Sequence, residues 1–225
     1  MNVVRAYYVL NMKMILKEKL PFIWSTLLPI IFLIANGQAV TDVMHLNFFW
    51  SFIIMSSYVF GVGLHAVRLR EQGLLKTYFS INQSRTQFFV ANILTQITFA
   101  FFSVLTLNLV ATVIYKLNFF LSMFYSMILI VMALPIAFLS INLTMIKKST
   151  FNTVNTVVTI IFFISLMLIN MTGVFNYLNP LLYTSKLLAI GTHIDILIYV
   201  FSSIVFILSG LFCIKKYEVN SIMRR

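Results

Sequence analysis

Charged residues are scarce in this chain of 225 residues. They make up 9% of the sequence, whereas 61% of the residues are hydrophobic and the mean hydropathy is +0.99. A soluble domain of this length cannot bury so much apolar surface, so most of the chain is expected to face lipid or other helices in lipid. The single cysteine, Cys213, can form no internal disulfide and belongs to no metal-ligand motif, so no metal site is expected.

Acidic residues are fewer still. Asp and Glu number five, and none of them lies inside a long apolar run. Carriers driven by protons or sodium ions usually need an ionisable group within the membrane, so a small secondary carrier is disfavoured. The sequence also has no G-x-x-x-x-G-K-[ST] phosphate loop and no G-x-S-x-G elbow. We therefore expect a chain that is not an enzyme by itself, with no catalytic residue and no bound cofactor of its own.

Positive charge dominates what little charge there is, with a net charge of +11 from sixteen Lys and Arg residues. An excess of this size can indicate a nucleic-acid partner. However, no basic residue lies inside the long apolar runs. Basic residues that are confined to the loops of a membrane protein fit attraction to anionic lipid better, so we expect no nucleic-acid binding.

Six apolar segments predict six transmembrane helices in a single all-α transmembrane domain, residues 1–225. Their expected bounds are 20–39, 47–67, 86–115, 119–146, 151–171 and 194–214. Pro135 is expected to kink the fourth of them.

Residues 1–19 are too charged to span a membrane. They place apolar residues on one side of a helical wheel and basic residues on the other, which predicts a helix in the membrane interface. Asn11 falls on the apolar side and weakens this pattern. An N-terminal extension of the first span is the alternative.

The basic residues also predict the topology. With six spans both termini lie on one side, and fourteen of the sixteen Lys and Arg residues then lie on that side, leaving Lys116 and Lys186 opposite. Cytoplasmic loops of membrane proteins carry the excess of Lys and Arg. We therefore expect a multi-pass protein with both termini in the cytosol.

Residues 68–84, between the second and third spans, are then cytosolic. Leu74, Leu75, Tyr78 and Phe79 fall at helical spacing within a stretch that also carries basic residues. This pattern predicts a short amphipathic helix, which could press on a soluble partner. A helix that simply lies on lipid is the alternative.

The segment 172–193, between the fifth and sixth spans, is expected to be external. It is moderately apolar, but glycines and the pair Asn179–Pro180 interrupt it, and Tyr183 and Lys186 are suited to the membrane interface. Two short half-helices that re-enter the membrane surface would satisfy its backbone. The alternative is a simple surface loop.

Neutral polar residues gather in two of the spans. Asn92 and Gln96 lie in the third, and the fifth holds Asn152, Asn155, Thr156 and Thr159. Such residues commonly form hydrogen bonds between helices, and that explanation suits any one of them. As two groups, they are expected to face protein or a polar pathway in preference to lipid.

The local sequence resembles one membrane-protein family. The run Arg70-Glu71-Gln72-Gly73-Leu74-Leu75-Lys76 is similar to the R-E-x-G-T-L-K run of type-2 ABC transporter membrane subunits, and Ser84-Arg85 and Phe88 follow it. Asn179-Pro180-Leu181 resembles the external N-P turn of the same family. One departure is Gln83, where the family often has a proline. The order of spans and loops resembles the family over nearly the whole chain.

The resemblance implies a permease subunit in a bacterial cytoplasmic membrane. The coupling helix of the family would comprise Arg70, Glu71, Gly73, Leu74, Leu75, Lys76, Tyr78 and Phe79. It would contact a separate ATPase, which binds ATP and Mg, with Glu71 and Lys76 at the rim of the contact. A second membrane subunit, identical or homologous, would complete the translocation pathway.

The expected cargo follows from the spans and from the resemblance. Spans without charge that are rich in Phe, Leu, Met and Ile suit an amphipathic or lipophilic cargo. Small subunits of this family serve exporters of lantibiotics and of cytolytic peptides such as phenol-soluble modulins, so export of an amphipathic peptide is the expectation. A non-transporting membrane scaffold subunit and a small secondary carrier remain as alternatives.

Overall fold

The computed structural model describes residues 3–17, 19–35, 40–74, 79, 85–146, 149–168, 179, 181–182, 188 and 193–217. This part of the chain is helical and contains no strand, which confirms the all-α class. Its helices are α1 (Val3–Lys17), α2 (Lys19–Ala35), η2 (Val43–Leu46), α3 (Asn47–Tyr58), η3 (Val59–Leu64), α4 (His65–Glu71), α6 (Arg85–Tyr115), α7 (Phe119–Met132), α8 (Leu134–Ile141), η4 (Asn142–Met145), α9 (Phe151–Met167) and α11 (His193–Lys216).

Among the described residues, four continuous helices are long and apolar enough to cross a membrane: Val43–Glu71, Arg85–Tyr115, Phe119–Met145 and His193–Lys216. They coincide with the second, third, fourth and sixth predicted spans. Two shorter apolar helices, Thr26–Ala35 and Phe151–Ser165, correspond to the first and fifth. The chain therefore has the character of a membrane protein.

The helix Val43–Glu71, which corresponds to the second predicted span, is longer than expected. It runs through Arg68 and Arg70 to Glu71, whereas the sequence predicted that the span would end at residue 67 and a separate segment would begin at 68. The residues from His65 to Glu71 contain no helix breaker. The helix ends only before Gly73, whose φ of 71° lies in the left-handed region that glycine adopts without strain.

The fourth predicted span, in which Pro135 was expected to cause a kink, is divided near this proline into two helical segments. α7 ends at Met132 and α8 begins at Leu134, with the proline in its first turn. A proline is tolerated there because the first amide groups of a helix have no partner within the helix.

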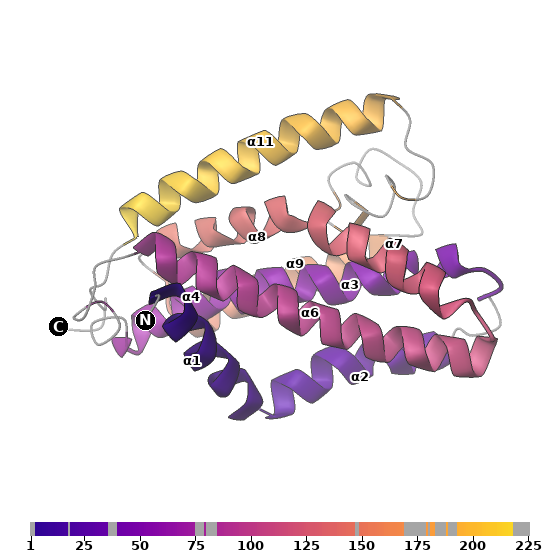
Figure 1. Ribbon diagram of the computed structural model, residues 1–225. Helices are drawn as coiled ribbons and strands as arrows, with labels where there is room; N and C mark the ends of the chain where they lie inside the picture. The colour runs from indigo at the N-terminus through magenta and orange to yellow at the C-terminus, as the bar shows by residue number, and fades with distance from the viewer. Residues whose placement is uncertain are drawn as a thin grey trace.

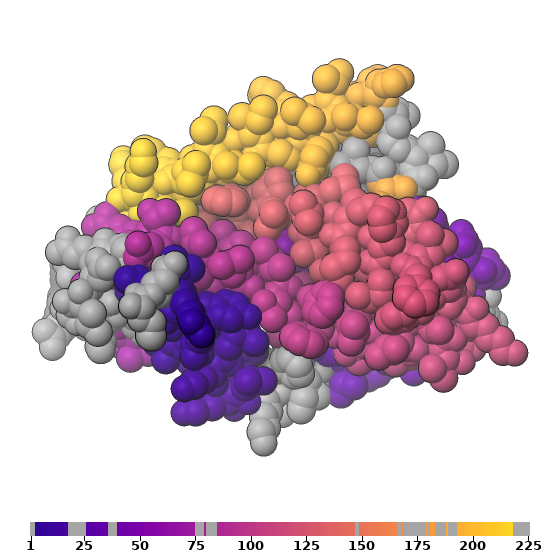
Figure 2. All heavy atoms as spheres, viewed as in Figure 1, coloured from indigo at the N-terminus to yellow at the C-terminus, as the bar shows by residue number. Residues whose placement is uncertain are grey.

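The helices form one bundle around α6. Figure 1 shows α1 and α2 on one side of α6, and α8 and α11 on the other. The largest fully buried side chains include Trp50, Tyr58, Phe88 and Phe89. α11 packs chiefly on α8 and forms one edge of the face seen in Figure 2. Leu197 and Phe201 of α11 are 69% and 73% exposed, as expected for a helix that faces lipid.

At one end of the bundle the helix termini are joined by hydrogen bonds. The Tyr217 hydroxyl, just beyond α11, donates to the Ala66 carbonyl of α4 at 2.7 Å. The Arg85 guanidinium at the start of α6 donates to the Lys215 carbonyl of α11. The ends of α4 and α11 and the start of α6 therefore lie together, and several basic residues share this end.

η3 is a π-helix within the long helix Val43–Glu71, and the sequence did not predict it. Such a segment leaves backbone carbonyls without their usual α-helical partners, so groups from neighbouring helices can donate hydrogen bonds to them. The Asn92 amide of α6 donates to the Val62 carbonyl at 3.3 Å, and the Ser140 hydroxyl of α8 donates to the Tyr58 carbonyl at 3.1 Å. The π-helix is thus held from two sides by polar side chains.

Candidate functional site

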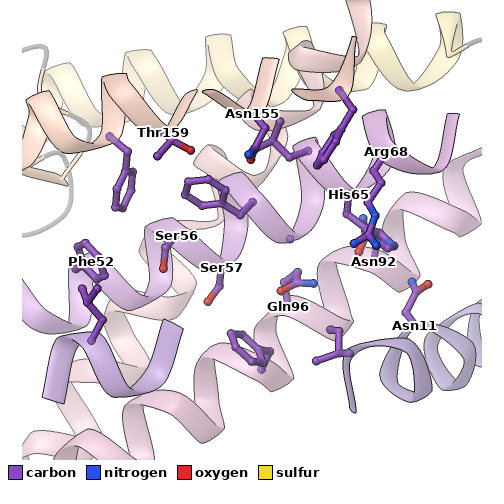
Figure 3. Close-up of a pocket in the computed structure, with 18 of the residues that line it drawn as sticks. Asn11, Phe52, Ser56, Ser57, His65, Arg68, Asn92, Gln96, Asn155 and Thr159 are labelled. Carbon is purple, nitrogen blue, oxygen red and sulfur yellow. The ribbon is translucent and has the colours of Figure 1, made fainter. Parts of the chain in front are cut away.

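A cavity of about 590 Å³ lies between five parts of the bundle (Figure 3). α1, α2 and α6 line one side, the continuous helix α3–η3–α4 lines the next, and α9 closes it from the opposite side. This volume falls within the range of about 300–1,000 Å³ that small-molecule sites occupy. The cavity is therefore the candidate site of this chain.

One end of the cavity is polar. His65 and Arg68 of α4 lie beside Asn92 of α6, and Asn11 of α1 reaches towards them from below in Figure 3. Asn155 of α9 also lines the cavity. Arg68 is close to the end of the long helix Val43–Glu71, so this end of the cavity lies near one end of the bundle.

The other end is aromatic. Phe52 of α3 marks it in Figure 3, and Phe60, Phe99 and Phe162 line the cavity with it. The Phe162 ring makes edge-to-face contacts with Phe52 and Phe60, with centroids 5.2 and 5.7 Å apart. Sixteen residues separate Phe52 from Arg68, which is roughly 24 Å along a helix. The cavity thus joins an apolar region inside the bundle to a basic end.

Two buried amides on the cavity have hydrogen-bonding atoms without a partner among the described residues. Asn11 is 2% exposed, and both its Nδ2 and its Oδ1 are unpaired. Asn92 is fully buried, and although its Nδ2 donates to Val62, its Oδ1 is unpaired. Buried polar atoms without partners are rare in folded proteins, because each costs about 1–3 kcal/mol. Both amides belong to residues that line the cavity.

The structure brings four of the six predicted pathway residues together. Asn92 and Gln96 of α6 face Asn155 and Thr159 of α9 across the cavity. The other two, Asn152 and Thr156, are exposed and do not line the cavity. The polar stripe of α9 is therefore wider than the cavity wall, and half of it points out of the chain.

The expected ATPase-coupling residues Arg70 and Glu71 make contacts within the chain. Arg70 is 4% exposed, and its guanidinium donates to the Thr144 carbonyl and, at 2.9 Å, to the Ile146 carbonyl. A Glu71 carboxylate oxygen accepts a hydrogen bond from the Phe151 amide. The carboxylate, expected at an exposed rim, therefore lies at the N-terminus of α9, where the amide groups and the helix dipole stabilise negative charge.

The described residues beyond Gly73 face different ways. Leu74 is 39% exposed, in keeping with a partner contact. Phe79 is 6% exposed and packs on the Phe88 ring with centroids 5.8 Å apart. It therefore faces the bundle, although the helical spacing placed it on the same apolar face as Leu74. Leu75, Lys76 and Tyr78 lie outside the described residues.

Part of the predicted external segment is packed against the bundle. Asn179 is 4% exposed; its side chain accepts from the Leu181 amide at 3.0 Å and donates to the Ser165 carbonyl of α9 at 2.8 Å. Leu181 is fully buried in a cluster with Phe162. This contact closes an Asx-type turn and attaches it to the end of α9. Pro180, Tyr183 and Lys186 lie outside the described residues.

Asn11, His65 and Arg68 are cavity residues that the sequence did not indicate. The only sequence signal for Asn11 is that a polar residue occupies the apolar face of the predicted amphipathic helix. His65 and Arg68 lie three positions apart, on one face of a helix that was expected to end between them. Within the described ranges, no three His, Cys, Asp or Glu side chains gather as metal ligands.

In the described part of the chain, the cavity lies close to the joined helix ends at its polar end. The chain matches no protein-family model, no curated protein and no solved structure.

Proposed function

We propose that this chain is the transmembrane subunit of an ATP-driven exporter of the type-2 ABC kind. The observation that carries the proposal is the position of Arg70 and Glu71. They join the end of α4, just before the turn at Gly73, to η4 and to the start of α9. α9 is a wall of the cavity, so a push on the turn by a separate ATPase would reach the cavity through direct hydrogen bonds.

The chain crosses the membrane six times in this proposal. α2 and α9 have 17 residues each, near the lower limit of about 17–25 for a transmembrane helix. The joined helix ends carry Arg68, Arg70, Arg85 and Lys215 to one end of the bundle, and the positive-inside rule assigns that end to the cytosol of a bacterium.

A reporter fused after Arg225 tests the topology. We expect a fusion to a cytosol-active reporter to be active and a fusion to an enzyme that matures only outside the cytosol to be inactive, because both termini lie with the basic residues. A fusion after Lys116, at the opposite end of α6, is the control and should give the reverse pattern. The same pattern at both positions would contradict the six-span topology.

The second membrane subunit is proposed to pack on the outer face of α9. Asn152 and Thr156 are exposed there, beside the exposed apolar residues Val157 and Ile160. The Thr156 hydroxyl already donates to the Asn152 carbonyl at 2.9 Å. Polar side chains on a transmembrane helix more often face protein than lipid, so the Asn152 amide would form hydrogen bonds with a second copy or a homologous chain. A cavity walled by α9 would then lie next to the subunit interface.

The coupling contact can be tested at Leu74, which is exposed just after the turn. We expect Leu74→Asp to abolish copurification of an ABC ATPase with the tagged protein, because it places an unpaired charge in an apolar contact. The amount of copurified ATPase is measured as vanadate-sensitive ATP hydrolysis in the purified sample. The denaturation midpoint of the membrane subunit should change little, since the Leu74 side chain is exposed.

A matched control is Lys13→Asp, which introduces the same charge at an exposed position of α1 and should retain the ATPase. If Leu74→Asp keeps both the ATPase and ATP-dependent transport in proteoliposomes, the turn is not the coupling contact. If the native complex hydrolyses no ATP and transports nothing, a scaffold subunit becomes the better proposal.

A further inference from the structure

We propose that the cavity binds an amphiphile whose head combines a carboxylate with an adjacent N–H donor, as at the C-terminus of an apolar peptide. The head would lie between Arg68, Asn11 and Asn92, and the apolar body would extend towards Phe52. That this ligand is the exported cargo rests on the proposed function. That the cavity binds it can be tested on the chain alone.

The positive charge in the cavity favours a ligand whose head group is negatively charged. Arg68 supplies a guanidinium, and none of the described residues that line the cavity is acidic. A guanidinium matches a carboxylate in shape as well as in charge, and the apolar surroundings strengthen the attraction.

The unpaired amide atoms indicate which hydrogen-bonding groups the head group of the ligand should carry. The Asn11 Nδ2 can donate a second hydrogen bond to a carboxylate, which accepts several. The Asn92 Oδ1 is an acceptor, because the Nδ2 of the same amide already donates to Val62, so it requires a donor on the ligand. A simple fatty acid has a carboxylate but no such donor. A peptide C-terminus or an N-acylated amino acid has both.

The aromatic end selects the body of the ligand. Phe52, Phe60 and Phe162 line that part of the cavity, and the small polar side chains beside them, Ser56 and Ser57, each donate to the Ile53 carbonyl of their own helix. With their hydrogens used inside the helix, these hydroxyls leave the wall largely apolar. An alkyl chain or a run of apolar side chains would replace water there at a gain of about 25 cal/mol per Å² of apolar surface.

Three acyl compounds separate these requirements. N-dodecanoylglycine has the carboxylate and the N–H, N-dodecanoylsarcosine has the carboxylate but no N–H, and N-dodecanoylglycinamide has the N–H but no charge. Binding of radiolabelled N-dodecanoylglycine is measured by equilibrium dialysis with the chain in lipid nanodiscs, corrected with empty nanodiscs. Compared with N-dodecanoylglycine, we expect N-dodecanoylsarcosine to compete about fivefold more weakly, which corresponds to the loss of a neutral hydrogen bond. N-dodecanoylglycinamide should compete about tenfold more weakly or less well still, because it loses charged hydrogen bonds.

Variants then assign each requirement to a residue. Arg68→Gln should weaken binding of N-dodecanoylglycine about tenfold or more, whereas Lys13→Gln, which removes the same charge from an exposed position of α1, should not change it. Asn92→Leu should remove the preference for glycine over sarcosine. Asn92→Leu removes an unpaired buried oxygen together with the 3.3 Å hydrogen bond to the Val62 carbonyl. These two changes oppose each other, so the denaturation midpoint should stay close to that of the parent.

Competition by an amphipathic peptide with a free or an amidated C-terminus identifies the source of the head. Displacement by the free peptide alone supports a peptide ligand, and displacement by neither supports a small acylated ligand of the same chemistry. The inference is overturned if Arg68→Gln binds as the parent does, or if the glycinamide compound competes equally. These results leave the proposed exporter function standing, whereas normal binding without ATP-dependent transport would refute that function alone.

Discussion

Gly63→Ala is expected to lower the free energy of unfolding by about 3 kcal/mol, at the upper end of the usual range for overpacking. A Cβ at this position would lie 2.2 Å from the Ser140 carbonyl oxygen and 2.7 Å from its carbonyl carbon. These are backbone atoms of α8, so no side chain can rotate to make room. The carbonyl of Tyr58 accepts a hydrogen bond from Ser140 nearby, which fixes the two helices at this distance.

α8 cannot move away, because α11 touches it on another face. A Cβ on Gly210 of α11 would lie 2.6 Å from the Phe138 carbonyl oxygen, so that contact is also backbone against backbone. We expect Gly63→Ala to lower the midpoint of thermal denaturation in detergent by about 6–12 °C.

Gly61→Ala is the matched control for this prediction. Its Cβ would meet only side-chain atoms of Gln96, the nearest at 2.1 Å, and that flexible side chain can turn into the cavity. Its denaturation midpoint should therefore fall much less, while ligand binding in the cavity should weaken. Equal shifts for the two alanines would mean that the contact between η3 and α8 is not as tight as described.

The long helices were predictable because hydropathy and length determine a membrane span almost by themselves. The starts at residues 119 and 151 agree with the prediction, and the start at 85 lies one residue before the predicted 86. These starts, and the interruption near Pro135, follow from sequence patterns within one helix. The π-helix Val59–Leu64 did not follow from such a pattern, since it depends on carbonyl partners such as Asn92 and Ser140, which come from other helices. Contacts between helices that lie far apart in the sequence leave no local signal.

The cavity was predictable in part for the same reason. Asn92, Gln96, Asn155 and Thr159 could be identified because a polar residue inside an apolar span is conspicuous. Arg68 and Asn11 lie in segments where polar residues are ordinary, so only the fold brings them to the cavity. The distinction between Thr159, which faces the cavity, and Thr156, which faces outwards, required the position of α9.

Arg70→Ala is expected to disrupt both the fold and the transport cycle. The Arg70 guanidinium caps the carbonyls of Thr144 and Ile146, at the end of η4, where helix carbonyls lack partners within the helix. Thr144 is 3% exposed, so water would not readily replace the arginine. Loss of these charged hydrogen bonds should cost about 2–4 kcal/mol and lower the denaturation midpoint by about 4–16 °C.

Arg70→Lys is the informative control, because a lysine keeps the charge but cannot match the two-point contact of a guanidinium. We expect it to recover only part of the stability. In complexes that still assemble, ATP hydrolysis by Arg70→Ala should no longer respond to cargo, since the link between the turn at Gly73 and the fourth predicted span is broken. Leu74→Asp should do the opposite and lose the ATPase without loss of stability. If Arg70→Ala instead keeps the parent's denaturation midpoint and loses only ATPase binding, then Arg70 contacts the partner directly and is not a link within the chain.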